Sequence, residues 1–163
     1  GQISGKARLV PVESVMEWRS RGKLRESKLK YKNGKVEFFR TSSDLVKEYH
    51  VKNPIGLANS LDPVSATLWF LKTRDEVTVC KGKIRIFDGF RLSEVVFLRK
   101  EKVASGVECF GTINRIAGFK SSDKSKRSLH FNQHYTKSRD DTYVISSFEI
   151  DTFFGKLSFK NLR

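Results

Sequence analysis

A tight turn at Asn33-Gly34 constrains the fold of this chain more than any other feature of its sequence. Both residues tolerate the positive φ angles of a type I′ turn, whose twist suits two antiparallel strands. Polar and apolar residues alternate around the turn in the stretch KLKYKNGKVEFF, residues 28–39. We therefore expect a β-hairpin whose buried face carries two cross-strand pairs, Tyr31 with Val36 and Leu29 with Phe38.

A first helix is expected over residues 42–52. The hydroxyl-rich residues 41–43 offer groups that cap free amides at a helix N-terminus, and Asp44 suits the positive first turn. Asn53-Pro54 ends the helix, because proline disfavours helical geometry in the residue before it.

A second helix is expected over residues 62–72, within the stretch LDPVSATLWFL. Asp62 suits the N-cap, and Pro63 suits the first helical position, where its missing N–H costs nothing. Three apolar residues recur at helical spacing and predict the inward-facing stripe: Val64, Leu68 and Leu71.

Beyond residue 72 the pattern is that of strands. A second hairpin is expected around Lys81-Gly82, with Val79 opposite Ile84 and Val77 opposite Ile86. Further candidate strands are VVFLR, VECFGTI, LHFNQHY, TYVISSFEI and KLSFK. The order of strand, two helices and many strands predicts an α+β fold, with twisted antiparallel sheet packed against two consecutive helices.

The chain is expected to form one domain, because its 163 residues contain no internal repeat and no proline-rich linker. We assign residues 1–20 to an extended basic arm and residues 21–163 to a globular domain. The longest apolar runs have four residues, far short of the ~18 that a membrane-spanning helix needs.

Cys80 and Cys109 are the only cysteines. Two cysteines are too few for a disulfide framework, and their spacing matches no metal or redox motif. We therefore expect both as small buried apolar side chains in a reducing compartment.

Net charge is the strongest indication of function. The chain has 32 Lys and Arg against 18 Asp and Glu, a formal charge of +14 and a pI near 10.0. Such an excess predicts a polyanionic partner, either nucleic acid or an anionic membrane surface. Two zones carry the candidate contacts: Arg19, Arg21, Lys23, Arg25, Lys28, Lys30 and Lys32 in the first, and Lys120, Lys124, Lys126 and Arg127 in the second.

No catalytic, metal or cofactor site is predicted. His130 and His134 are four residues apart, which suits zinc on a helix, but the surrounding stretch LHFNQHY alternates like a strand. The acidic residues of the C-terminal half lack a phosphate-binding loop or a nucleophile motif to accompany them. The sequence therefore favours a binding or structural protein over an enzyme.

Four motifs in residues 28–71 follow one another in a recognisable order: KLKYKNG, FFRTSSDL, IGLA and LWFL. In this order and spacing the chain resembles the rhabdovirus matrix proteins. The residues that carry the resemblance are interpreted as structural: Phe39, Arg40, Thr41, Ser43, Asp44, Ile55, Gly56 and Ala58.

The resemblance implies a viral structural protein that bridges and condenses the viral ribonucleoprotein and the anionic inner membrane surface during assembly and budding. Its implied partners are viral nucleocapsid or RNA, anionic membrane, host factors and other copies of itself. The implied locations are the virion, the host cytoplasm, the inner membrane surface and the nucleus. The late-domain motif Pro-Pro-x-Tyr is absent, which is compatible with a plant-infecting member.

Two alternatives remain open. One is a sequence-tolerant nucleic-acid-binding protein that stacks bases on sheet aromatics such as Phe131 and Tyr135. The other concerns the arm, which docks either on its own domain or on a neighbour as an added strand. The arm's apolar residues are the candidates for self-association: Ile3, Leu9, Val10 and Val12.

Overall fold

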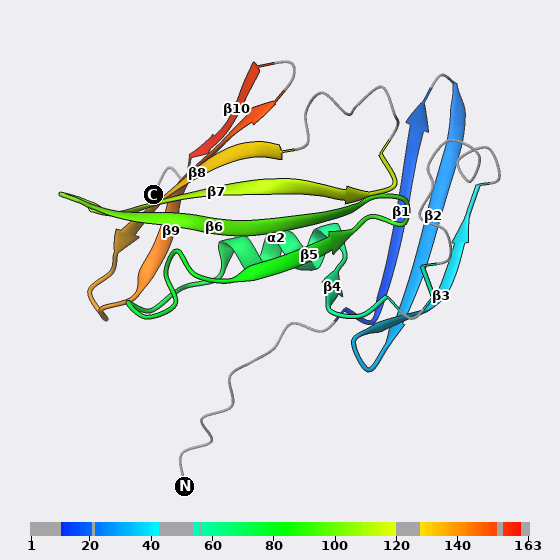
Figure 1. Ribbon diagram of the computed structural model, residues 1–163, viewed down its shortest axis with the longest axis horizontal. Helices are drawn as coiled ribbons and strands as arrows, with labels where there is room; N and C mark the ends of the chain where they lie inside the picture. The colour runs from blue at the N-terminus through cyan, green and yellow to red at the C-terminus, as the bar shows by residue number, and fades with distance from the viewer. Residues whose placement is uncertain are drawn as a thin grey trace, which may run out of the picture.

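Two β-sheets make up most of the computed structural model, which describes residues 11–20, 22–42, 54–55, 57–119, 128–152 and 155–160. The smaller sheet has the order β1-β2-β3, and the larger has the order β10-β9-β8-β7-β6-β5-β4 (Figure 1). The small sheet stands at one end of the large one (Figure 1). Its strands are β1 (Glu13–Ser20), β2 (Lys23–Lys32) and β3 (Lys35–Thr41).

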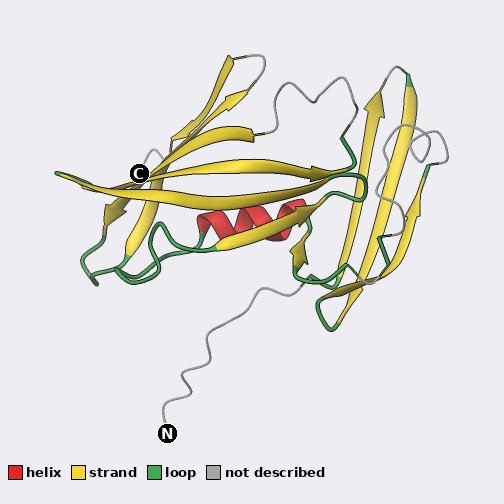
Figure 2. Cartoon of the chain, viewed as in Figure 1, coloured by secondary structure: helices red, strands yellow, loops and turns green. Residues whose placement is uncertain are grey.

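The larger sheet is antiparallel except for its short first strand, which pairs with β5 in parallel. One helix interrupts the strands near the start of this sheet (Figure 2). The elements are β4 (Ser60–Leu61), α2 (Pro63–Leu71), β5 (Lys83–Phe87), β6 (Leu92–Val103), β7 (Gly106–Ala117), β8 (Ser128–Lys137), β9 (Tyr143–Thr152) and β10 (Gly155–Lys160).

The predicted α+β class with two consecutive helices is therefore wrong. Strands make up 66% of the described residues and helix 7%, so the fold is dominated by sheet. The predicted helix over 62–72 is confirmed as α2, whose N-cap Asp62 accepts hydrogen bonds from the amides of Val64 and Ser65 at 3.0 and 3.2 Å. The predicted helix over 42–52 lies outside the described residues apart from its first position.

The face of α2 that packs inward is not the predicted one. Val64, Leu68 and Leu71 are 66, 52 and 44% exposed, whereas Ala66 is buried. The aromatic pair Trp69-Phe70 contacts the sheet instead, because two aromatic rings remove more apolar surface from water than the aliphatic stripe would.

An aromatic cluster joins α2 to the large sheet. Trp69 stacks on Phe97 of β6 with ring centroids 5.9 Å apart. Phe70 lies 6.1 Å from Phe131 of β8 and 5.9 Å from Phe148 of β9. The Phe131 ring lies over Gly111 of β7. An added Cβ at Gly111 would lie 2.2 Å from this ring, so this strand position requires glycine.

The second predicted hairpin is also wrong. Residues 76–80 form a turn, in which the Asp75 side chain accepts a hydrogen bond from the Thr78 amide at 2.7 Å. The Asp75 carbonyl accepts a further bond from Val79 at 2.9 Å. This local bonding withdraws Val77 and Val79 from any strand, and β5 pairs with β6 and β4.

The two sheets meet through a second apolar cluster. Leu29 and Val36 of the small sheet pack with Phe87 and Leu92 of the large one, and all four are buried. Gly89, at a φ of +93°, lies in the turn between these last two residues. A Cβ there would meet the Ser27 hydroxyl at 2.1 Å, so glycine permits the sheets to approach.

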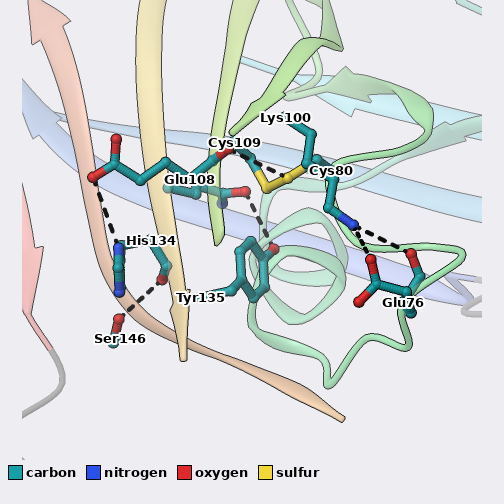
Figure 3. Close-up of a disulfide and its surroundings, with 9 residues drawn as sticks. Glu76, Cys80, Lys100, Glu108, Cys109, His134, Tyr135 and Ser146 are labelled. Atoms are coloured by element: carbon teal, nitrogen blue, oxygen red, sulfur yellow. Dashed lines mark hydrogen bonds and ion pairs between the residues drawn. A yellow bond between two sulfur atoms is a disulfide. The ribbon is translucent and has the colours of Figure 1, made fainter. Parts of the chain in front are cut away.

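A disulfide joins Cys80 to Cys109, and it corrects the expectation of two reduced thiols (Figure 3). Both cysteines are buried, Cys80 at the end of the 76–80 turn and Cys109 on β7. The bond ties the irregular segment after α2 to the middle of the sheet. A spacing of 29 residues gives no motif, so only the fold could reveal the pairing.

Removing this disulfide should lower the free energy of unfolding. Closing a loop of about 30 residues contributes roughly 3.5 kcal/mol in the chain-entropy account. We expect C80A/C109A to lose about 2–4 kcal/mol in guanidinium denaturation relative to the oxidised wild type. Free thiols in the denatured, unreduced wild type, measured with a thiol reagent, would contradict the pairing.

Glu76 attaches the 76–80 turn to the large sheet through an ion pair and a hydrogen bond. Its carboxylate lies 2.6 Å from the Lys100 ammonium (Figure 3). It also accepts a hydrogen bond from the Tyr143 hydroxyl. These bonds, first that from Lys100 and then that from Tyr143, lower the pKa of Glu76 to about 2. The turn is thereby connected to both β6 and β9.

The depressed pKa makes stability depend on pH in the acid range. A carboxylate with a lowered folded-state pKa stabilises the protein above its ordinary pKa of about 4.3. This contribution is lost as pH falls toward 2, so E76Q should be less stable than wild type at pH 7 and approach it at pH 2.5. Thermal melts of both proteins at these pH values test this, with E101Q as the control for losing one surface carboxylate. A constant difference would contradict it.

Candidate polyanion-binding surface

The outer face of the small sheet, defined as the face turned away from its buried cluster, gathers many of the basic residues. Register places Glu13, Val15, Glu17 and Arg19 of β1 beside the even-numbered residues 24–30 of β2. Lys28 and Lys30 in turn lie opposite Arg40 and Phe38 of β3. This face carries six basic residues, Arg19, Lys28, Lys30, Lys32, Lys35 and Arg40, and four acidic ones, Glu13, Glu17, Glu26 and Glu37.

A β-bulge sets the position of Phe38. The predicted pair Tyr31 with Val36 is confirmed, with Asn33 and Gly34 at φ angles of 51° and 72°. Between Lys30 and Tyr31 the register then shifts by one residue, so Leu29 pairs with Phe39 and not with Phe38. The prediction of a buried Phe38 is therefore wrong: its ring is 42% exposed on the outer face.

Ion pairs neutralise part of this face. Lys28 lies 2.6 Å from Glu13, and Lys32 lies 3.4 Å from Glu37. The hydrogen bond from Lys28 lowers the pKa of Glu13, so this carboxylate is ionised at neutral pH. The face is thus a mixed surface with a positive excess.

The structure places four predicted contact residues on this one face: Arg19, Lys28, Lys30 and Lys32. Lys23 and Arg25 alternate with them along β2 and occupy its opposite face, so the structure separates these two predicted contacts from the other four. Five further predicted contacts lie outside the described residues: Arg21, Lys120, Lys124, Lys126 and Arg127.

The predicted self-association residues are mostly untested. Ile3, Leu9 and Val10 lie outside the described residues. Val12 is 74% exposed, and its carbonyl accepts a hydrogen bond from Tyr31 at 2.9 Å. This bond continues the β1–β2 ladder by one residue.

Three members of the surface were missed by sequence analysis: Lys35, Phe38 and Arg40. The two lysines on either side of the Asn33-Gly34 turn could have identified Lys35, because Lys32 and Lys35 are opposite each other in a two-residue hairpin. A bulge leaves no comparable pattern, since Phe38 and Phe39 are chemically identical candidates for the buried position.

The alternative stacking residues cannot act as predicted. Phe131 is 3% exposed and Tyr135 is fully buried, on the sheet face that α2 covers. Neither ring can receive a base. This observation removes these two rings as the stacking positions of a nucleic-acid-binding protein.

Three polar residues at one end of the large sheet are arranged somewhat like a catalytic Ser-His-acid triad. The Ser105 hydroxyl lies 3.0 Å from Nε2 of His134, and Glu108 lies 3.8 Å from Nδ1. The distance between Glu108 and His134 is too long for a hydrogen bond, and Ser105 lies in an exposed turn between β6 and β7.

Among the described residues, no group of three or more His, Cys, Asp or Glu is placed to bind a metal.

Comparison with known proteins identifies no relative: no protein family, no curated protein and no solved structure matches this chain. Within the described parts of the chain, no helix has both the length and the apolar character needed to cross a membrane.

The bulge makes neighbouring phenylalanines differ in their effect on stability. Phe39 packs against Phe87 and Phe90, with ring centroids 6.4 and 6.3 Å away, whereas Phe38 faces outward. We expect F39A to lower the free energy of unfolding by about 2 kcal/mol or more, and F38A by no more than about 1 kcal/mol. Urea denaturation measures both, and equal losses would contradict the observed register.

Proposed function

We propose that this chain is a non-catalytic protein that binds an anionic membrane surface peripherally, through the outer face of the small sheet. The observation that carries the proposal is an exposed aromatic ring among basic residues, Phe38 beside Lys30 and Arg40. Each basic side chain near an anionic leaflet contributes about 1 kcal/mol. An apolar ring that enters the interface adds a contribution that salt does not screen.

Two further apolar residues support contact with lipid. Val15 and Leu24 are 51 and 61% exposed on the same outer face. Apolar groups interspersed with lysines suit a surface that is charged at its headgroups and apolar beneath them. Because the acidic residues reduce the charge of this face, binding would rest on both effects together.

Sequence-tolerant binding of single-stranded nucleic acid is the second candidate, because Phe38 could stack on one base between Lys30 and Arg40. Such proteins ordinarily stack successive bases on several exposed rings. Phe38 is the one Phe, Tyr or Trp with a described side chain on this outer face. The lipid surface is therefore the better fit.

The matrix-protein role expected from the motifs in residues 28–71 stays a prediction. The Cys80–Cys109 disulfide fits that role poorly, because disulfides persist in oxidising compartments whereas the resemblance implies action at the inner membrane surface. The membrane proposal does not depend on that role. It requires only an anionic surface.

Reversing the two charges beside Phe38 tests the proposal. We expect K30E/R40E to bind phosphatidylserine vesicles at least about tenfold more weakly than wild type in sedimentation, the equivalent of roughly 1.4 kcal/mol. The matched control K81E/K102E changes net charge equally, at exposed residues outside this face, and should bind nearly as wild type.

Two outcomes would contradict the membrane proposal. One is equal loss of binding in the two charge-reversed variants, which would show a response to net charge alone. The other is retention of single-stranded RNA by wild type with no retention of vesicles, which would favour the second candidate. F38A should reduce the vesicle binding that persists in about 0.5 M salt, where screening lengths fall below about 8 Å.

A further inference from the structure

The two sheets each end in a strand that has no neighbour on one side among the described residues. These strands are β1, at the edge of the small sheet, and β10, at the edge of the large one. They lie well apart in the molecule (Figure 1), so one chain cannot pair them with each other. The remaining edges are shorter or partly covered: β4 has two residues, and Lys35 of β3 bridges to Ala58.

The β10 edge has a distinct pattern on each face. All six of its residues are exposed. Leu157 and Phe159, 63 and 50% exposed, lie on the same face as their β9 partners Ile150 and Phe148 and continue the aromatic cluster outward. Lys156 and Lys160 lie on the opposite face, four residues apart.

The β1 edge has the complementary pattern. Glu13 and Glu17 lie on its outer face, also four residues apart, with Val15 between them. The alternate residues Ser14 and Met16 lie on the other face. An acidic pair and a basic pair of equal spacing thus occupy the two open edges of one chain.

We propose that β1 of one copy of this chain pairs antiparallel with β10 of the next copy, so that the small sheet of one molecule extends the large sheet of another. One register places Glu13 opposite Lys160 and Glu17 opposite Lys156. The same register places Met16 opposite Leu157 and Ser14 opposite Phe159. Cross-strand partners share a face, so this register places two ion pairs on one face and the apolar pair of Met16 and Leu157 on the other.

Charge selects this register over its neighbours. A shift of two residues in one direction places Val15 opposite Lys156 and Glu13 opposite Ser158, which removes both ion pairs. A shift in the other direction places Arg19 opposite Lys156, which opposes like charges. The existing contacts of these groups, Glu13 with Lys28 at 2.6 Å and Lys156 with Glu149 at 3.3 Å, leave the Glu13 carboxylate a second acceptor oxygen and the Lys156 ammonium further N–H donors for new partners.

Charge also disfavours the pairing of β10 with itself. A twofold pairing centred on Ser158 would place Lys156 opposite Lys160, and lysines on an edge strand are a common protection against such contact. Pairing between unlike edges is heterologous, and when its rotation does not close it forms an open head-to-tail chain of molecules. This contact uses described strands and does not need residues 1–10.

Reversing the charges of one edge at a time tests the pairing. Sedimentation velocity at low salt should show concentration-dependent assembly of the wild type. The variants Glu13→Lys/Glu17→Lys and Lys156→Glu/Lys160→Glu should each associate at least about tenfold more weakly, because each opposes like charges across the contact. An equimolar mixture of the two variants should assemble again, since each then offers edges that match the other.

Recovery of assembly in the mixture would show that the single variants lose edge pairing. A change in net charge or a folding defect would not be reversed by mixing. Glu17→Lys alone keeps the ion pair between Glu13 and Lys28, so it serves where the double variant fails to fold by circular dichroism. The proposal is overturned if the wild type stays monomeric at all concentrations, if the single-edge variants assemble as wild type, or if the mixture does not recover.

Discussion

The packing of Trp69 and Phe70 against the large sheet is the interaction on which the rest of the structure depends. These rings orient α2, and α2 covers the face that carries Phe97, Phe131 and Phe148. The helix is then held at its C-terminal end, where buried Arg74 donates to the Trp69 carbonyl at 2.8 Å and stacks over the Trp69 ring. A cation near the last carbonyls of a helix is favourable, so one residue contributes to the end of α2 and to its aromatic contact.

The segment that follows depends on this anchor. Arg74 exchanges backbone hydrogen bonds with Tyr143 of β9, which directs the chain into the 76–80 turn. Cys80 and Glu76 then attach that turn to β7 and β6. The segment between α2 and β5 thus obtains its order from one disulfide, one ion pair and one backbone bridge, in place of the hairpin that its alternating sequence suggests.

The sequence was sufficient to predict those elements that are determined by residues close together in the chain. The Asn33-Gly34 turn and the Asp62-Pro63 start of α2 both depend on residues within a few positions of each other, and both are confirmed. It failed where tertiary contacts decided among local choices. Which stripe of α2 is buried depends on the shape of the sheet opposite, and whether Phe38 or Phe39 is buried depends on one bulged residue. The disulfide pairs residues that only the folded chain brings together.

The same limit applies to the candidate surface. Net charge predicted a polyanionic partner, but alternation along β2 divides its basic residues between two faces and separates Arg25 from Lys28. The outer face alone has a small positive excess, because Glu13 and Glu17 of β1 share it. If the edge pairing proposed above forms, Lys156 and Lys160 of a neighbour would come to lie beside these two carboxylates, on the same face. Assembly would then repeat the lipid-facing surface along the chain of molecules. Membrane binding and assembly would therefore strengthen each other, since many weak contacts on one surface add through multivalency.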